Sequence, residues 1–180
     1  ISDELINSTV YTEDKHFYEH FGFDFLRIIK ALYTNIKVGS NVQGASTITQ
    51  QYVKNLFLDF DKTWERKWNE MWLTLNMETH YSKNEILEGY LNTIYYGHGM
   101  YGVESAAKYY FGKSASDLSL AEAALLVAIP KAPSKYSPIT NYDAAKERQL
   151  LILNNMYTNG FITKIELDNA LKLIKSNFFN

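Results

Sequence analysis

The chain has 180 residues, of which 46% are hydrophobic and 21% charged, and its formal net charge at pH 7 is -2. This composition is typical of a globular protein, and the near-neutral charge, without a long block of one sign, argues against general nucleic-acid binding. Cysteine is absent, which excludes disulfides, thiolate metal ligands and a cysteine nucleophile. No run approaches about 18 apolar residues, so we expect no bilayer-spanning segment. The chain begins at Ile1 rather than Met, and we expect a fragment or a processed form.

The stretch YTEDKHFYEHFGFD, residues 11–24, combines two adjacent carboxylates with two histidines among five aromatic residues. On a continuous helix Glu13, His16 and His20 would share one face, and a carboxylate with two imidazoles can bind zinc. A di-iron site would need a second Glu-x-x-His, which the sequence lacks. The alternatives are an acid–base site and a half-buried helix with incidental histidines. The remaining histidines, His80 and His98, lie in ordinary settings.

The next segment, residues 21–42, is rich in large apolar side chains. They fit either a membrane-dipping surface or a small core, and we favour membrane contact. The residues concerned are Phe23, Phe25, Leu26, Ile28, Ile29 and Leu32. The stretch NIKVGSNVQG, residues 35–44, contains Gly, Ser and Asn and is the best candidate for a mobile loop.

The segment GASTITQQYVKN, residues 44–55, predicts a helix that begins near Ser46 and Thr47. The free amides of a helix N-terminus favour an anion, and Lys54 could hold a phosphate as a point charge. The pattern Gly-x-x-x-x-Gly-Lys is missing, so this is not a P-loop. A well-capped amphipathic helix without a ligand explains the spacing equally well.

Residues 62–81 predict a helix with a broad apolar stripe, formed by Trp64, Trp68, Met71, Trp72 and Leu75. Arg66 and Glu70 lie on the opposite side, but they share it with apolar residues. This pattern predicts burial on both faces, with Arg66 and Glu70 directed into an interior or a cleft. They form either a structural salt bridge or a charged cleft wall, because unpaired buried charge is unfavourable.

Helix start signals recur along the chain, and strand-like alternation is scarce. A hydroxyl residue is followed three positions later by Glu or Gln in Thr47–Gln50, Ser82–Glu85, Ser119–Glu122 and Thr163–Glu166, which predicts capping boxes. We expect Pro130 to end the helix AEAALLVAI, and Gly160 to take the left-handed conformation at a helix end. The sequence therefore predicts a mostly helical protein with roughly seven to ten helices.

Two of these helices carry further candidate residues. KNEILEGYLNTIYYG, residues 83–97, predicts a core helix on which Glu88 is an ordinary polar position. AAKERQLLILNNM, residues 144–156, predicts an amphipathic helix with Arg148 as the residue to test.

Five blocks occur in a fixed order: EDKHFYEHFG, GASTITQQ, RKWNE, KNEILEGYLN and KERQLLIL. Together they resemble the motif series of the peptidoglycan glycosyltransferases of glycosyltransferase family 51, and the resemblance covers residues 1 to about 173. It implies a mostly α fold with a lysozyme-like large lobe and a smaller membrane-facing jaw lobe. Residues 1–180 would form one such domain, with the jaw at about 22–45, in a fragment of a longer membrane-anchored chain.

The resemblance implies a peptidoglycan glycosyltransferase that polymerises lipid II into β-1,4 glycan strands, with inversion at C1 and release of undecaprenyl pyrophosphate. Glu13 matches the catalytic base and Glu70 the second essential glutamate, which orders cations or binds a divalent metal, magnesium or manganese. Substrate and pyrophosphate positions match Ser46, Gln50, Gln51, Lys54, Arg66, Lys67 and Arg148. Supporting positions match Asp14, Glu88 and Asn92, the last two in packing of the large lobe.

One departure concerns the fifth block, where the family has two consecutive arginines and this chain has Arg148 followed by Gln149. Gln149 cannot inherit a phosphate-binding role. The resemblance further implies a location on the outer face of the bacterial cytoplasmic membrane, with an anchoring N-terminal helix absent from this chain. Its partners would be lipid II, the growing glycan, the membrane surface, a linked transpeptidase domain and cell-wall synthesis proteins. The rival functions are a lysozyme-like hydrolase or lytic transglycosylase, and a non-catalytic precursor-binding domain.

Overall fold

The structure, a computed structural model, describes residues 1–40, 44–57 and 64–175. Over these ranges it contains nine helices, which confirms the prediction of a mostly helical fold. They are α1 (Asp3–Glu13), α2 (Phe25–Val38), α3 (Ile48–Phe57), α4 (Trp64–His80), α5 (Lys83–Thr93), α6 (Val103–Phe111), α7 (Leu120–Ala128), α8 (Tyr142–Thr158) and α9 (Lys164–Lys175). Among the described residues, no helix is both long and apolar enough to cross a membrane.

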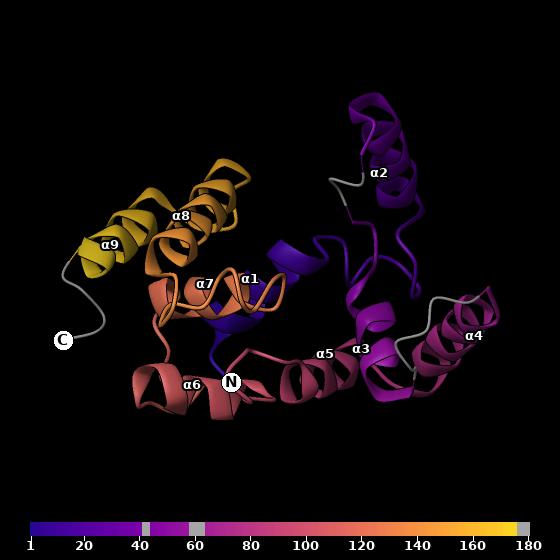
Figure 1. The fold of residues 1–180 in the computed structure, drawn as a ribbon, viewed down its shortest axis with the longest axis horizontal. Coiled ribbons are helices and arrows are strands. Elements are labelled where there is room, and N and C mark those ends of the chain that lie inside the picture. Colours follow the sequence, from indigo (N-terminus) through magenta and orange to yellow (C-terminus); the bar gives the residue numbers. More distant parts are fainter. Residues whose placement is uncertain (41–43, 58–63, 176–180) are drawn as a thin grey trace. The chain divides into compact units, whose positions relative to one another are not determined.

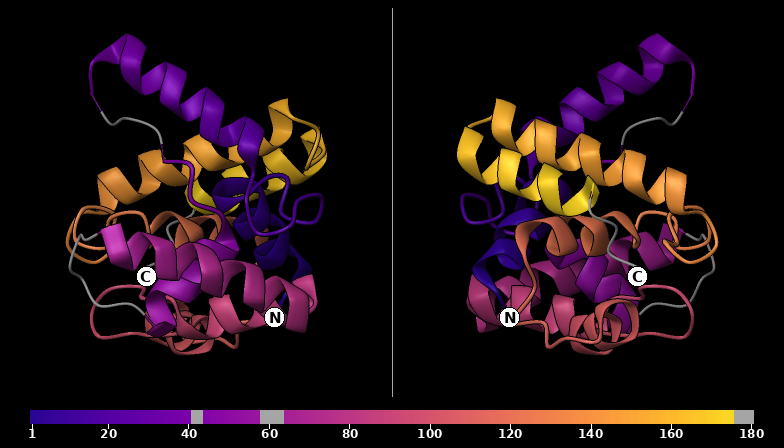
Figure 2. Two further views of the ribbon diagram at one scale, coloured as in Figure 1. Left: turned by 90° about the vertical axis from the view of Figure 1, so that its right-hand side faces the viewer. Right: turned by 90° about the vertical axis from the view of Figure 1, so that its left-hand side faces the viewer.

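The residue contacts divide the chain into two compact units. Unit 1 combines Ile1–Thr12 with the chain from Asn92 onward, and unit 2 is Glu13–Leu91. Unit 1 is built around α7, in which every residue from Ala121 to Ala128 is buried. Helices α6, α8 and α9 pack against it, and α8 and α9 lie side by side (Figures 1 and 2). The alanines of α7 allow this close approach because they add little side-chain bulk.

The capping boxes predicted from sequence are confirmed in all four places. At the start of α7, the Ser119 hydroxyl accepts from the Glu122 amide while the Glu122 carboxylate accepts from the Ser119 amide at 2.9 Å. The same reciprocal bonds join the other three predicted pairs. Helix α7 ends at Ala128, just before Pro130, and Gly160 is left-handed with a φ of 75°. These helix ends are therefore set by residues close to them in sequence.

Glu122 makes the stability of unit 1 sensitive to acid. Burial raises the pKa of Glu122, but hydrogen bonds from the Lys113 ammonium at 2.7 Å and from the Ser119 hydroxyl and amide together lower it below its ordinary value. A carboxyl whose pKa is lower in the folded state stabilises the fold above its unfolded pKa, and this contribution is lost as pH falls through the folded pKa.

We therefore expect Glu122→Gln to destabilise the chain at neutral pH and to flatten the fall in stability below about pH 4.5. Urea unfolding followed by circular dichroism between pH 3 and pH 7 measures both effects. The matched control is Glu166→Gln, which alters an exposed capping box and leaves the acid limb steeper than Glu122→Gln does. An acid limb of Glu122→Gln as steep as that of the wild type contradicts the assignment.

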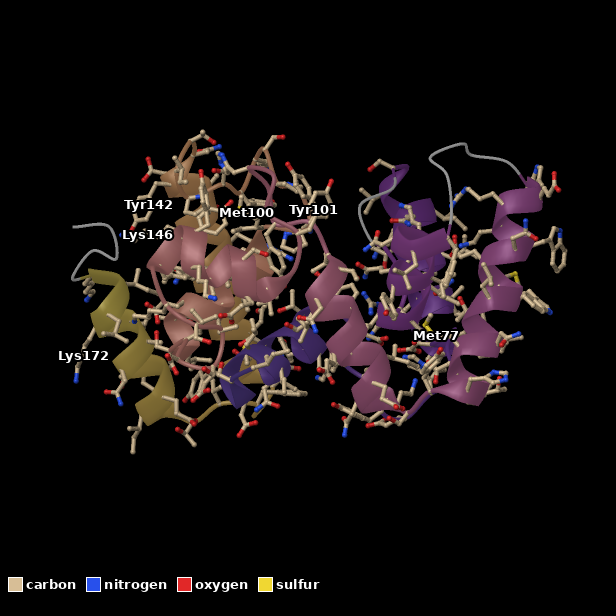
Figure 3. All side chains as sticks on the ribbon, turned by 90° about the horizontal axis from the view of Figure 1, so that it is seen from below. Met77, Met100, Tyr101, Tyr142, Lys146 and Lys172 are labelled. Carbon is tan, nitrogen blue, oxygen red and sulfur yellow. The ribbon has the colours of Figure 1, made fainter. Side chains whose placement is uncertain are left out.

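Unit 2 is built on the packing of α3 against α4. Helix α5 also approaches α3 closely at Gly89, where a Cβ atom would lie 2.2 Å from the Tyr52 hydroxyl. Met77 is buried on α4, and Figure 3 shows its side chain directed toward the interior of the unit. The apolar stripe of α5 is buried as predicted, at Ile86, Leu87, Tyr90 and Leu91.

The prediction that the residue 62–81 helix is buried on both faces is wrong. Its buried stripe consists of Glu70, Thr74, Met77 and Glu78, which recur at helical spacing on the side that α3 covers. The tryptophan stripe lies outside that contact, and Trp64, Trp68 and Trp72 are 86%, 66% and 64% exposed. The sequence shows two apolar faces, but only one of them has a helix to pack against among the described residues of unit 2.

Helix α2 also overturns part of the loop prediction for residues 35–44. The helix continues to Val38 and is closed by Gly39 in the left-handed conformation, while residues 41–43 lie outside the described residues. Asp24 caps its start by accepting from the Arg27 amide at 2.9 Å. Helix α2 shares no extensive interface with another described helix of unit 2, and it stands apart from α3 and α4 (Figure 1).

Candidate active site

The site begins where α1 ends, at Glu13. The residues that follow form turns rather than a continued helix, so Glu13, His16 and His20 do not share a helical face and the zinc interpretation is wrong. His16 pairs with exposed Glu19 at 3.0 Å, while His20 turns toward Asp14. Within the described ranges, no group of three His, Asp or Glu side chains could hold a metal ion.

Asp14 organises this segment from a fully buried position. Its carboxylate lies 3.0 Å from His20 Nε2 and accepts from the Ile48 amide at 3.0 Å. Ile48 is the first residue of α3, so the Asp14 charge lies at the positive end of that helix. Arg27 Nη1 is 3.7 Å from the same carboxylate. Asp14 therefore ties the segment after α1 to the starts of α2 and α3, which supports the predicted supporting role.

Arg27 also fixes the backbone at Glu13. Its Nη1 donates a hydrogen bond to the Glu13 carbonyl oxygen. A guanidinium has several donors in a rigid plane, so it can serve the carbonyl of one residue and the carboxylate of the next. The Glu13 backbone is thereby held in place by a charged group from α2.

The Glu13 side chain is oriented by Gln51. Gln51 Nε2 donates to Glu13 Oε2 at 3.0 Å, and Gln51 Oε1 accepts from the Tyr90 hydroxyl at 3.2 Å. The amide is thus held from both ends, by α1 and by α5. Glu13 is half-buried, and Oε1 of its carboxylate has no hydrogen bond to a described residue. This oxygen is available to take a proton from a substrate hydroxyl.

Gln50, the preceding residue, holds the second predicted glutamate. Gln50 Nε2 donates to Glu70 Oε1 at 3.2 Å, while Gln50 Oε1 accepts from the Thr47 amide in the capping box. Lys67 forms an ion pair with Glu70 Oε1, and Arg66 Nη1 lies 3.5 Å from Glu70 Oε2. The structure therefore brings Glu13 and Glu70 to adjacent glutamines in the first turn of α3, with two cations beside Glu70.

A further buried carboxylate, Glu78, lies near the C-terminal end of α4 and joins this helix to its neighbours. Glu78 accepts from the Thr49 hydroxyl at 2.5 Å and pairs with Lys83 at 2.7 Å. Gly22 passes close to the same helix, with a φ of 80°, and a Cβ atom there would lie 2.8 Å from Thr74 Cγ2. Glycine is required at this position because both the left-handed backbone and the close approach exclude a side chain.

The other predicted site residues of this region have exposed side chains. Lys54 is exposed on α3, one turn beyond the two glutamines, and forms no ion pair with a described residue. Ser46 is exposed immediately before α3. Glu88 and Asn92 have exposed side chains, while the stripe of α5 that packs is the apolar one. Their role in packing of the large lobe stays a prediction.

The fifth-block residues belong to unit 1. Arg148 lies half-buried on α8. Gln149 is buried beside it, and its Nε2 donates to the Ala121 carbonyl at 2.7 Å. Gln149 therefore joins α8 to α7, which explains why an amide serves at this position.

Sequence reasoning missed three residues that hold the site. Arg27 lies within the apolar segment of residues 21–42, and its contacts with Glu13 and Asp14 arise only in the fold. Tyr90 belongs to the predicted core helix, and the sequence does not indicate that its hydroxyl bonds to Gln51. His20 contacts the Asp14 carboxylate six positions earlier in the chain, a pairing that the sequence did not indicate.

Comparison with known proteins gives a consistent result. The family model described as "Transglycosylase" matches residues 1–157. Penicillin-binding protein 2D of Bacillus subtilis (strain 168) is 54% identical over 93% of this chain and 24% of its own length. Penicillin-binding protein 1A of Aquifex aeolicus (strain VF5) is 48% identical over 95% of this chain and 24% of its own length. The chain thus spans about a quarter of the length of these relatives.

A solved structure, penicillin-binding protein 1A from Haemophilus influenzae, is similar to 69% of this chain and 15% of its own, with 33% identity and a TM-score of 0.48. The family match covers most of the chain and contains all the site residues described in unit 2. The chain therefore belongs to the transglycosylase family, the peptidoglycan glycosyltransferases that its motifs resemble.

Proposed function

We propose that this chain polymerises lipid II into β-1,4-linked glycan, with Glu13 as the general base. The observation that carries the proposal is the pair of adjacent glutamines, Gln50 and Gln51, which hold Glu70 and Glu13. The two glutamines place the carboxylates of Glu13 and Glu70 in different electrostatic environments. One carboxylate has an oxygen available for a proton, and the other is paired with cations.

In the proposed reaction the 4-hydroxyl of the acceptor sugar attacks C1 of the donor and transfers its proton to Glu13. The new C1–O bond forms as the bond from C1 to the pyrophosphate oxygen breaks, and the electron pair leaves with undecaprenyl pyrophosphate. Attack from the face opposite the leaving group inverts the configuration from α to β. Gln51 orients the base, and this kind of positioned proton transfer contributes about 10²–10⁴-fold to rate.

The leaving group develops negative charge, which favours cations at its oxygens. Lys67 and Arg66 are candidates because Glu70 holds both of them in unit 2. Exposed Lys54 follows on the same helix as the two glutamines, and Ser46 precedes it. Arg148 lies on α8 of unit 1, and its role toward the pyrophosphate stays a prediction from the resemblance. A hydrolase of neutral glycan has no need of such cations, which favours the transferase over the hydrolase.

A divalent cation at Glu70, magnesium or manganese, remains a prediction. Glu70 is a single carboxylate whose oxygens already face Gln50, Lys67 and Arg66. Such ions take several oxygen ligands, so this donor set fits them poorly by itself. No step of the proposed reaction depends on a metal here.

The direct test is turnover of labelled lipid II, with purified murein incubated in parallel. Polymeric glycan together with released undecaprenyl pyrophosphate supports the proposal. Soluble muropeptides from murein, without polymer from lipid II, would identify the lysozyme-like hydrolase or lytic transglycosylase instead. Binding of lipid II without any turnover would identify a precursor-binding domain.

We further propose that unit 2 contacts the outer face of the bacterial cytoplasmic membrane, in a protein anchored by a helix that precedes this chain. Helix α2 exposes Leu26, Ile29 and Ile36 by 82%, 65% and 73%, together with two lysines. Apolar side chains with adjacent lysines suit the boundary of an anionic bilayer. The exposed tryptophan stripe of α4 has the composition of interfacial segments. A linked transpeptidase domain and cell-wall synthesis proteins remain proposed partners.

We expect Ile36→Asp to weaken binding to phosphatidylglycerol vesicles by at least about tenfold, because a large apolar side chain contributes roughly 1.5–3 kcal/mol on burial. Co-sedimentation measures the partition. The matched control is Ile165→Asp on α9, since Ile165 and Ile36 are both 73% exposed. Trp68→Asp tests the stripe of α4 in the same assay. Equal loss from the α9 variant would contradict a specific membrane face.

A further inference from the structure

We propose that the aromatic loop of unit 1, residues 95–102 with Tyr109 and Tyr110, binds an oligosaccharide of β-1,4-linked amino sugars. The proposal rests on the proposed function in one respect, because that reaction makes such a glycan. None of the predicted site residues belongs to this loop. His98, which seemed ordinary from sequence, lies in the middle of it.

The ring contacts of this aromatic cluster form two groups, Tyr95 with Tyr101, and His98 with Tyr109 and Tyr110. Tyr95 and Tyr101 are 4.8 Å apart between ring centroids, and their backbones form a bridge. His98 stacks on Tyr109 at 5.7 Å and meets Tyr110 edge-on at 6.1 Å. Tyr110 forms the buried floor, where its hydroxyl donates to the Tyr96 carbonyl at 2.8 Å.

The environment of Tyr110 reflects this packing. Burial, with smaller contributions from Tyr109 and Tyr95, raises the pKa of Tyr110 to about 12. The floor of the cluster is therefore a neutral, buried phenol. The rim is different: Tyr101, Tyr109 and Tyr95 are 64%, 45% and 38% exposed. A cluster that served only to stabilise the loop would be expected to bury these rings.

The backbone of the loop is held in an unfavourable conformation. Gly97, His98 and Gly99 have φ values of 81°, 49° and 76°, and His98 is the non-glycine residue with positive φ among those described. A left-handed non-glycine residue persists only when its surroundings hold it. Here His98 Nε2 lies 2.8 Å from the Ser137 hydroxyl, and the Tyr95 hydroxyl accepts from the Gly99 amide at 3.3 Å. The loop therefore presents its rings in a fixed arrangement.

The chemistry of the rim favours a saccharide over a lipid. Its exposed side chains are tyrosine and histidine, each with an apolar face and a polar edge. A pyranose ring has the complementary surface, with C–H groups on its faces and hydroxyls at its edge. The exposed surface of α2 is rich in leucine and isoleucine instead. Figure 3 shows Tyr101, beside Met100, at the surface of unit 1.

The test is titration of the isotope-labelled 180-residue chain with the β-1,4-linked tetramer of N-acetylglucosamine, followed by NMR. We expect amide shifts at residues 97–102, and about tenfold weaker binding for Tyr101→Ala because a stacking ring is lost. Tyr101→Phe keeps the ring and should bind within about twofold of the wild type. The matched control is Tyr33→Ala on α2, since Tyr33 and Tyr101 are 67% and 64% exposed.

A second variant, Tyr109→Ala, tests the loop without altering the Tyr95–Tyr101 pair, and it should also weaken binding. Shifts confined to α3, or wild-type affinity in both alanine variants, would overturn the proposal. Failure of lipid II turnover with loop binding intact would instead overturn the proposed function alone.

Discussion

Glu13→Gln is expected to abolish glycan polymerisation while the chain stays folded. The substitution keeps the size of the side chain and removes its capacity to accept a proton. We expect a loss of about 10²–10⁴-fold in the rate of lipid II turnover, the usual contribution of a general base. The amide oxygen of the new side chain can still accept from Gln51 Nε2, so little change in thermal unfolding is expected. Turnover of labelled lipid II and a circular dichroism melt provide the two measurements.

The control for this variant is Glu19→Gln in the same segment. Glu19 is exposed and pairs with His16 at 3.0 Å, away from the Gln51 contact. Its substitution should leave turnover within about twofold, because exposed ion pairs contribute little. Retained polymerisation by Glu13→Gln would remove the base from the proposed mechanism, and parallel losses in both variants would indicate a general effect of charge.

Asp14→Ala is expected to cause the largest loss of stability in unit 2. Its carboxylate is fully buried and meets His20, Arg27 and the Ile48 amide. Removal leaves the Ile48 amide and the His20 ring without this partner, while Arg27 keeps its bond to the Glu13 carbonyl. Breaking such a buried pair destabilises by about 3–5 kcal/mol. Urea unfolding monitored by tryptophan fluorescence follows this unit directly, because the three tryptophans of the chain lie on α4.

The matched comparison is Asp24→Ala, ten positions later. Asp24 is also buried, but its carboxylate serves one helix amide at the start of α2. Loss of a single cap destabilises by about 1 kcal/mol. If the two variants lose the same stability, the network around Asp14 contributes no more than an ordinary helix cap, and its assigned role is wrong.

The features predicted best from sequence are those set by nearby residues. The capping boxes at Ser119 and Thr163 formed as expected because both partners lie within one helical turn. Gly160 is left-handed for the same local reason. Glu13 and Glu70 were identified through a resemblance, and the spacing of residues alone left metal, acid–base and packing interpretations open.

Features that depend on distant residues could not be predicted in the same way. The pattern of α4 showed two apolar faces, and only the position of α3 decides which of them is buried. The link from Asp14 to the Ile48 amide joins positions 34 residues apart, and no local rule pairs them. The left-handed backbone of His98 could not be predicted from sequence, because it depends on neighbours in space, including Ser137.

Gln50 illustrates how narrow the chemical choice at one position can be. Its side-chain oxygen must accept from the Thr47 amide while its nitrogen donates to Glu70. Glutamate could close the helix start but would repel Glu70, and lysine could bind Glu70 but has no acceptor for the amide. Asparagine has the right groups on a shorter side chain. Glutamine therefore combines the acceptor and the donor on a side chain long enough to make both contacts.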